Sequence, residues 1–228
     1  MLLPLGPLVN ALAIFSGACI GMLLGARMPE RVRQIVFQGI GLCVLIIGVQ
    51  NALKTAYPLI MIFSIVLGSV IGEMLNLEDR LSHVGDTLKQ HISSANPRFT
   101  EGFLGASVIF CVGAMAILGS FEEGLGHGRN IVYTKSILDG FTAMAMASAL
   151  GLGVLFSGFS VLIYQGLLVL FASLLIPWLS PPVMTELTAT GGIIILGIGI
   201  NMLELLRIRL ANMIPALLVV VILSYVGI

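Results

Sequence analysis

Charged side chains are scarce in this sequence. The 228 residues include only 11 lysines and arginines and 11 aspartates and glutamates, so 10% of the chain is charged and the formal net charge is zero. So little polar surface cannot cover a water-soluble globule. A chain without a basic face also lacks the means to bind a phosphate backbone, so we expect no nucleic-acid partner.

Cysteine and the common catalytic motifs are also poorly represented. Cys19, Cys43 and Cys111 are odd in number, lie in apolar stretches and lack the spacing of metal ligands, so we interpret them as small packing residues. No HExxH motif occurs, and no Ser–His or paired-Asp motif stands out. We therefore expect no enzyme, no metal site and no cofactor.

Apolar residues are abundant instead. They make up 58% of the chain, and the mean hydropathy is +1.10. A helix needs about 20 mostly apolar residues to cross the ~30 Å of hydrocarbon in a bilayer. The sequence therefore predicts an all-α membrane protein with about eight transmembrane helices. They are expected at residues 6–26, 34–53, 57–76, 102–120, 137–156, 159–178, 188–206 and 211–228. The start of the chain has no basic region before its apolar run, so we expect the first helix to be retained.

Residues 77–100 interrupt the apolar pattern. Five apolar residues recur there at helical spacing among charged ones, which is typical of an amphipathic helix at the membrane surface. They are Leu77, Leu81, Val84, Leu88 and Ile92.

Lysine and arginine are unevenly divided between alternate loops. The loops after the first, third and seventh helices hold most of them, which predicts that these loops are cytoplasmic. With eight spans, both termini then lie outside, and an odd number of spans would place the C-terminus inside.

The two halves of the chain resemble each other. LVNA (8–11) matches ILDG (137–140), VFQG (36–39) matches IYQG (163–166), and LGSVIGEMLNL (67–77) matches LGIGINMLEL (196–205), all at offsets of 127 to 129 residues. We interpret residues 1–120 as a first four-helix repeat with an insertion at 77–100, 121–136 as a connecting loop, and 137–228 as a second four-helix repeat. Four crossings between equivalent positions predict parallel repeats. If 121–136 or the fourth helix folds back, the repeats are inverted.

Polar residues within the apolar stretches occupy matched positions in the repeats. They pair Asn10 with Asp139, Gln38 with Gln165, Glu73 with Asn201 and Asn76 with Glu204. Polar residues at membrane depth are costly and usually face the interior of the bundle. They are therefore candidates to line a path for a cation or a polar solute. The alternative is that the amides join helices by hydrogen bonds and that the Glu/Asn pairs lie at headgroup level.

Other charged residues have simpler interpretations. Lys135 lies four residues before Asp139, which predicts an ion pair on one helix face. Glu122 and Glu123 follow the fourth helix, where they either concentrate cations at an outer mouth or are solvated loop charges. Asn212, three residues before Pro215, is predicted to cap the last helix.

Small residues form two faces that favour close helix packing. Gly17, Gly21 and Gly25 recur on the first helix, and Ser64, Gly68 and Gly72 recur on the third. These faces pack either within one chain or across a homodimer, and both alternatives stay open.

Several motifs resemble a known family. FCVGAMAILGSFEEGL (110–125), YTKSILDG (133–140), YQG (164–166) and GIGINMLEL with ANMIPAL (within 197–217) closely resemble the YdfK/YqgA-like family of bacterial integral-membrane proteins, over nearly the whole chain. That family is described only as uncharacterised or as candidate transport proteins. The resemblance implies a bacterial inner-membrane protein and assigns no functional residue.

The sequence thus favours a transporter of the inner membrane. Its predicted partners are the lipid bilayer and a small solute or cation, which binds between the two repeats. A passive channel and a membrane scaffold without transport activity are the alternatives.

Overall fold

The structure is a computed structural model that describes residues 4–27, 29–80, 83, 87, 90, 98–111, 114–175 and 180–227. Within these ranges it contains helices and no strands, which confirms the all-α prediction. Most of the predicted surface segment 77–100 lies outside the described residues. The helices in chain order are α1 (Leu5–Arg27), α2 (Glu30–Ala52), α3 (Pro58–Met74), α5 (Phe99–Cys111), α6 (Ala114–Gly124), α7 (Asn130–Leu150), α8 (Leu152–Leu170), α9 (Ala172–Leu175), α10 (Pro181–Met202), the 3-10 helix η2 (Leu210–Met213) and α11 (Ala216–Gly227).

Four of the described helices have the length and hydropathy of a membrane span. They are α1, α2, α8 and α10, and the pair α5 and α6 makes a fifth candidate that is bent by 60°. Residues 58–74 and 210–226 form shorter apolar helices. The protein is therefore a helical membrane protein with four to five candidate spans among the described residues, against about eight predicted from hydropathy.

Several helix boundaries differ from the prediction. The helices α7, α8 and α10 each begin seven residues before their predicted starts at 137, 159 and 188. For α8, the physical reason is a glycine inside an apolar run. Gly151 ends α7 with φ 73°, a left-handed conformation that favours glycine, so one apolar stretch holds the end of one helix and the start of the next.

The chain forms two compact units. Unit 1 comprises residues 1–37 and 85–177, and unit 2 comprises residues 38–84 and 178–228. Each unit takes helices from both halves of the sequence, so the units do not coincide with the predicted repeats. The repeat division at 1–120 and 137–228 therefore stays a prediction about sequence.

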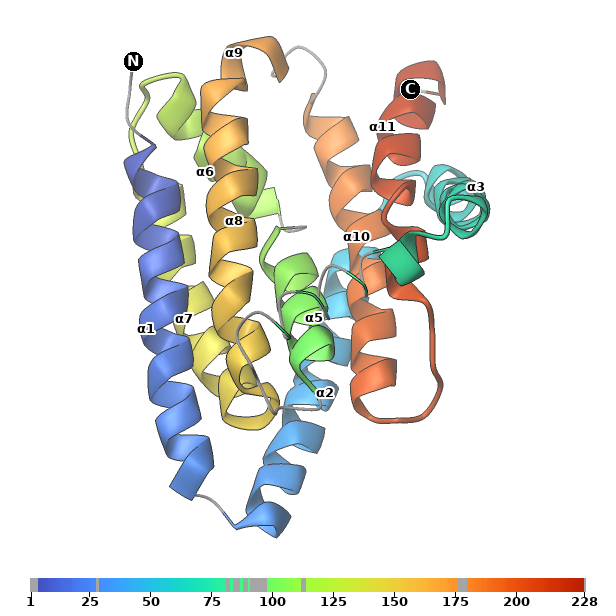
Figure 1. The fold of residues 1–228 in the computed structure, drawn as a ribbon. Coiled ribbons are helices and arrows are strands. Elements are labelled where there is room, and N and C mark those ends of the chain that lie inside the picture. Colours follow the sequence, from blue (N-terminus) through green and yellow to red (C-terminus); the bar gives the residue numbers. More distant parts are fainter. Residues whose placement is uncertain are drawn as a thin grey trace. The chain divides into compact units, whose positions relative to one another are not determined.

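In unit 1, α1 and α7 lie side by side at very close range, as Figure 1 shows. A Cβ atom at any of three glycines of α1 would lie under 3.0 Å from a backbone carbonyl oxygen of α7. The pairs are Gly17 with Gly140, Gly21 with Met144, and Gly25 with Ser148. Because the residue numbers rise together, the two helices run in the same direction. The predicted glycine face of the first helix is confirmed, and its partner lies within the same chain.

The bent pair α5 and α6 packs along the side of α8. Near the start of α8, a Cβ at Gly153 would clash with the carbonyl oxygen of Phe99, and farther along Ser107 Oγ donates to Ser160 Oγ at 3.1 Å. Beyond the bend, a Cβ at Gly124 would clash with the carbonyl oxygen of Val169, near the end of α8. Together α5 and α6 therefore cover the length of α8, as one broken span does and a helix that folds back does not. The span predicted at 102–120 thus corresponds to two helices bent by 60°, which together make one candidate span.

Unit 2 is also packed through small residues. A Cβ at Gly68 of α3 would lie under 3.0 Å from Ala216 of α11, and one at Gly72 from the carbonyl oxygen of Asn212. The predicted face of Ser64, Gly68 and Gly72 is thus buried within the chain. A Cβ at Gly48 of α2 would likewise lie under 3.0 Å from the backbone of Leu196 in α10.

Candidate functional site

Four polar side chains meet inside unit 1. Asn10 comes from α1, Lys135 and Asp139 from α7, and Gln165 from α8. The close packing of α1 on α7 brings Asn10 beside Asp139. At 1.5 Å per residue, Asn10 lies about 7–8 Å along the axis from the first residue of α1, and Asp139 about 13–14 Å from that of α7. These four residues, here called the polar cluster, are therefore within helices and away from their ends.

Hydrogen bonds connect the polar cluster through one amide group. Asn10 Nδ2 donates to Asp139 Oδ2 and to Gln165 Oε1, each at 3.0 Å. Lys135 Nζ forms an ion pair with the same Asp139 Oδ2, which confirms the predicted pair of residues four apart. Asn10 and Asp139 are matched positions in the sequence repeat, and they contact each other directly.

The polar cluster is closed off from solvent. Asn10 and Gln165 are 0% exposed, Lys135 is 5% exposed and Asp139 is 8% exposed. Two residues at the end of α5 complete its surroundings. Lys135 Nζ lies 5.9 Å from the centre of the Phe110 ring, a cation–π distance, and the charges of Lys135 and Asp139 act on the Cys111 thiol. The helix α5 ends at Cys111, and α6 is bent by 60° relative to it.

Two polar atoms of the cluster are buried without a hydrogen-bond partner. They are Asn10 Oδ1 and Gln165 Nε2. The orientation of the Asn10 amide follows from its two donated hydrogen bonds, because its oxygen would repel the Asp139 carboxylate. Each unpaired buried group costs about 1–3 kcal/mol. The cluster thus keeps one acceptor and one donor available at an energetic cost.

Three glutamates bind the starts of helices, and two of these helices, α1 and α7, carry residues of the polar cluster. Glu123 accepts hydrogen bonds from the Gly6 backbone N–H at 3.2 and 2.9 Å, and Glu122 accepts one from the Ile131 N–H at 3.0 Å. They stabilise the first turns of α1 and α7, where the helix dipole favours a carboxylate. Glu123 is 2% exposed, so it is not a solvated loop charge.

Arg129 completes the contacts of Glu123. Its Nε donates to the Glu123 carboxylate at 2.7 Å, and this hydrogen bond raises the pKa of Arg129 above its usual value. Glu123 is therefore fully engaged, which argues against the predicted role as a cation-attracting charge at an outer mouth.

The third glutamate was not identified from the sequence. Glu186 of α10 is 0% exposed and accepts hydrogen bonds from Thr55 Oγ1 at 2.5 Å, from the Ala56 N–H at 2.7 Å and from the Tyr57 N–H at 3.1 Å. It therefore caps the start of α3. Glu186 belongs to no repeated motif, and the only sequence signal is a single carboxylate inside the apolar run 181–202.

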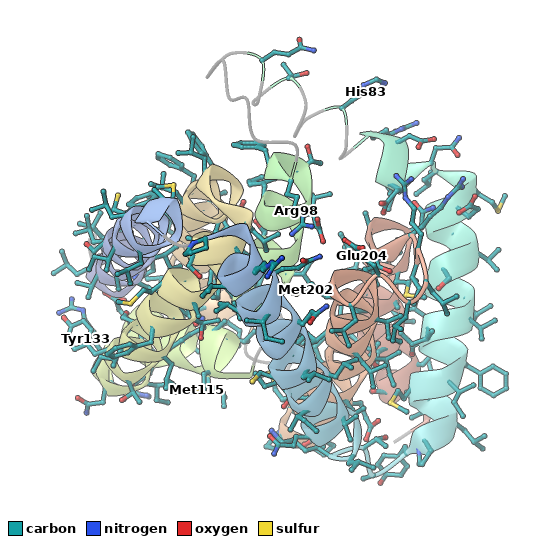
Figure 2. The ribbon with its side chains drawn as sticks, turned by 90° about the horizontal axis from the view of Figure 1, so that it is seen from below. His83, Arg98, Met115, Tyr133, Met202 and Glu204 are labelled. Atoms are coloured by element: carbon teal, nitrogen blue, oxygen red, sulfur yellow. The ribbon has the colours of Figure 1, made fainter. Side chains whose placement is uncertain are left out.

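The matched motifs at 67–77 and 196–205 form the ends of α3 and α10. Asn76 and Glu204 both adopt the left-handed conformation, with φ 50° and φ 56°, two residues after the last helical residue of each helix. Figure 2 labels Met202 and Glu204 at the end of α10. The repeated Met-Leu pair is thus a helix terminus in both copies.

Glu73 and Asn201 fix the segment between α10 and α11. Glu73 accepts hydrogen bonds from Arg209 at 2.6 Å and from Asn212 at 2.5 Å, and Asn201 makes two hydrogen bonds of 2.8 Å to the backbone of Ile208. The side chain of Asn212, predicted to cap the last helix, instead binds Glu73 and the backbone N–H of Glu78 at 2.7 Å. These contacts lie at helix ends, as the alternative interpretation of the Glu/Asn pairs requires.

The structure therefore brings together three of the eight predicted path residues. Asn10, Asp139 and Gln165 meet in unit 1, and Gln38, which is exposed on α2, belongs to unit 2. The other four are Glu73, Asn76, Asn201 and Glu204 at the helix ends of unit 2. Lys135 is the member that the sequence identified only as the ion-pair partner of Asp139. Among the described residues, no three His, Cys, Asp or Glu side chains are grouped to hold a metal ion.

Helices of bilayer length around a buried charged cluster define the class of protein, an α-helical membrane protein. The family described as "Protein of unknown function (DUF554)" matches residues 5–225, and the chain belongs to that family. It is 33% identical over 225 residues to the "Uncharacterized protein YqgA" of Escherichia coli (strain K12), covering 96% of each chain. It is 28% identical over 218 residues to the "Uncharacterized membrane protein YdfK" of Bacillus subtilis (strain 168), covering 94% of this chain and 93% of that one. These matches confirm the resemblance noted in the sequence. No solved structure matches the chain.

Proposed function

We propose that this protein transports a small solute or cation across the bacterial inner membrane, without enzymatic activity, and that the polar cluster is its binding site. The supporting observation is the buried ion pair of Lys135 and Asp139 together with two unpaired amide atoms. A charged residue in the centre of a bilayer costs about 2.5–3.5 kcal/mol, so intramembrane charges usually mark a functional path.

The broken helix supports transport over a purely structural role. In many transporters the binding site lies beside discontinuous helices, where backbone groups are free from helix hydrogen bonds. Here the Phe110 ring of α5 lies 5.9 Å from Lys135 Nζ, and α5 and α6 are bent by 60° relative to each other. A scaffold that only holds helices together needs neither a bend at this place nor a pair of opposite charges.

The proposed topology has eight crossings in two parallel repeats, with both termini outside. Besides the five candidate spans, it needs α3, the segment 210–226 and α7 to cross. The first two have 17 residues each, at the lower limit of a span, and α7 has 21. The matched helices α1 and α7 run in the same direction, and adjacent glutamates cap both starts, which supports parallel repeats.

Uptake into proteoliposomes tests the proposal. The purified full-length protein is reconstituted, and the uptake of radioactive sodium, rubidium and glycine is compared with that of empty liposomes. We expect at least one probe to accumulate, and Asp139→Asn to lower its rate at least tenfold. If none of the three probes enters faster than into empty liposomes, the transport proposal is wrong. Single-channel currents across a planar bilayer would instead favour the passive channel.

A further inference from the structure

We infer that the polar cluster binds a small zwitterion, a molecule that carries one ammonium and one carboxylate group, as free amino acids do. The inference rests on the proposed function and names the substrate class of the same site. It starts from the hydrogen-bonding groups that the cluster leaves unused and from the two charges that it holds.

The unused groups are one acceptor and one donor on neighbouring amides. Asn10 Nδ2 donates to Gln165 Oε1 at 3.0 Å, and a second hydrogen bond, from Gln165 Nε2 to Asn10 Oδ1, would complete an amide pair. This second bond is not formed, and neither atom has another partner among the described residues. A cluster that only joined helices would gain stability by closing the pair. The two amides are therefore free to bind a ligand that donates one hydrogen bond and accepts another.

The charges of the cluster show the same division into donor and acceptor. Asp139 is an acceptor and Lys135 is a donor, and in the structure they satisfy each other. The free acceptor belongs to Asn10, which is hydrogen-bonded to the Asp139 carboxylate. The cluster thus has two acceptors, on Asp139 and Asn10, and it also has two donors, on Lys135 and Gln165. An ammonium group supplies only donors and a carboxylate supplies only acceptors, so a zwitterion complements all four.

Charge balance favours a zwitterion over an ion. Lys135 and Asp139 neutralise each other, and neither is more than 8% exposed. A lone cation beside Asp139 would leave Lys135 uncompensated, and a lone anion beside Lys135 would leave Asp139 uncompensated. An uncompensated buried charge is strongly unfavourable. A zwitterion brings both charges, so its ammonium pairs with Asp139, its carboxylate pairs with Lys135, and the site stays neutral.

The ion pair can open without a movement of α7. Lys135 precedes Asp139 by one helical turn, and a lysine carries its charge on a flexible stem of four carbon atoms. Rotation of this stem withdraws the ammonium from the carboxylate while the backbone stays in place. The ligand then enters between the two charged groups.

The structure also leaves space next to Gln165. Gly166 is the following residue of α8 and is buried. Apart from its chain neighbours and the backbone of α8, no atom of the described residues lies within 4 Å of the position that a Cβ would take there. At Gly153 and Gly158, two other buried glycines of α8, a Cβ would lie under 3.0 Å from another segment. The space at Gly166 is small, which favours a ligand of the size of glycine.

Competition tests the substrate class in the natural chain. The full-length protein is reconstituted into liposomes, and the uptake of radioactive glycine is measured with an excess of each of four unlabelled compounds. They are glycine, methylammonium, which lacks the carboxylate, acetate, which lacks the ammonium, and glycine betaine, whose nitrogen has no N–H to donate. We expect radioactive glycine to enter, and only unlabelled glycine to suppress its uptake.

Gln165→Met tests the free donor. Methionine is similarly long and flexible but lacks the Nε2 donor, and the variant keeps the pair of Lys135 and Asp139. Loss of one hydrogen bond to a carboxylate should raise the KM for glycine about tenfold or more, with the maximal rate per folded protein within about twofold of the natural chain. A purely structural role of Gln165 would lower the maximal rate and leave KM unchanged. Gln38→Met, at the matched and exposed position of α2, is the control and should keep the natural KM.

Different results overturn the inference and the proposed function. If sodium or rubidium accumulates and glycine does not, the inference is wrong while transport stands. Suppression by methylammonium, acetate or glycine betaine as strong as by glycine, or an unchanged KM in Gln165→Met, also overturns the inference. If Gln165→Met does not fold, the competition decides alone. If none of the three probes enters faster than into empty liposomes, the proposed function itself fails.

Discussion

The contact between α1 and α7 yields a quantitative prediction at Gly21. Even a single Cβ at this position would lie under 3.0 Å from the carbonyl oxygen of Met144, and backbone cannot move away as a flexible side chain can. Gly21→Val places three carbon atoms there. Overpacking lowers the stability by about 1–3 kcal/mol. The higher helix propensity of valine relative to glycine offsets only about a few tenths of a kcal/mol of this loss. We therefore expect a net loss of about 2 kcal/mol, which lowers the melting temperature by about 4–8 °C in a chain of this size.

The assay is size-exclusion chromatography of the detergent-solubilised protein after heating. Gly39→Val is the matched control, because a Cβ at Gly39 of α2 has no atom within 4 Å. The control should melt within about 2 °C of the natural chain. If the two variants melt at the same temperature, the close parallel packing of α1 on α7 is refuted.

Three further predictions concern buried or strained side chains. Glu186→Ala removes the acceptor for the Ala56 and Tyr57 N–H groups and should lower the stability by about 2 kcal/mol. The same heating assay measures this loss, and an unchanged melting temperature would contradict the capping role. Asn76→Val forces a β-branched residue into φ 50° and should lower the free energy of unfolding by about 1–2 kcal/mol. Asn76→Gly should leave the stability unchanged or raise it. The opposite order of stabilities would contradict the left-handed conformation at this helix terminus. Lys135→Met leaves Asp139 without its counter-ion and should lower the free energy of unfolding by about 3–5 kcal/mol. The double variant Lys135→Met with Asp139→Leu should lose less stability than the single variant. If the two changes are simply additive, the result argues against the ion pair.

Hydropathy predicted the helical class and most helix positions because every helix that crosses a bilayer needs about 20 mostly apolar residues. The first helix was expected at 6–26 and is found at Leu5–Arg27. Boundaries failed where apolar residues continue through a turn. Gly151 ends α7 in a left-handed conformation, yet the residues on both sides of it are as apolar as a helix interior. Hydropathy assigns the polar first turns of α7 to a loop, because hydropathy does not include the burial of these turns against α1 and α6.

The repeat placed Asn10, Asp139 and Gln165 in one set of eight candidate residues, and these three meet within unit 1. It could not separate them from Glu73 and Asn201, because a matched polar position at a helix end resembles one inside a helix when only spacing is known. The capping role of Glu123 was missed for a related reason. Its partner is a backbone N–H 117 residues away. Every residue except proline has such a group, so the sequence does not indicate which one binds the carboxylate.

The most direct test of the central claim compares two carboxylate variants in one uptake experiment, with the probe that the natural chain accumulates. Asp139→Asn removes the negative charge of the polar cluster, and Glu73→Gln removes a negative charge that binds Arg209 and Asn212 at a helix end. Initial rates are measured in proteoliposomes with equal amounts of each protein. The account predicts at least a tenfold loss for Asp139→Asn and less than a twofold change for Glu73→Gln. An Asp139→Asn variant that takes up this probe as fast as the natural chain, or an equal loss in both variants, would contradict it.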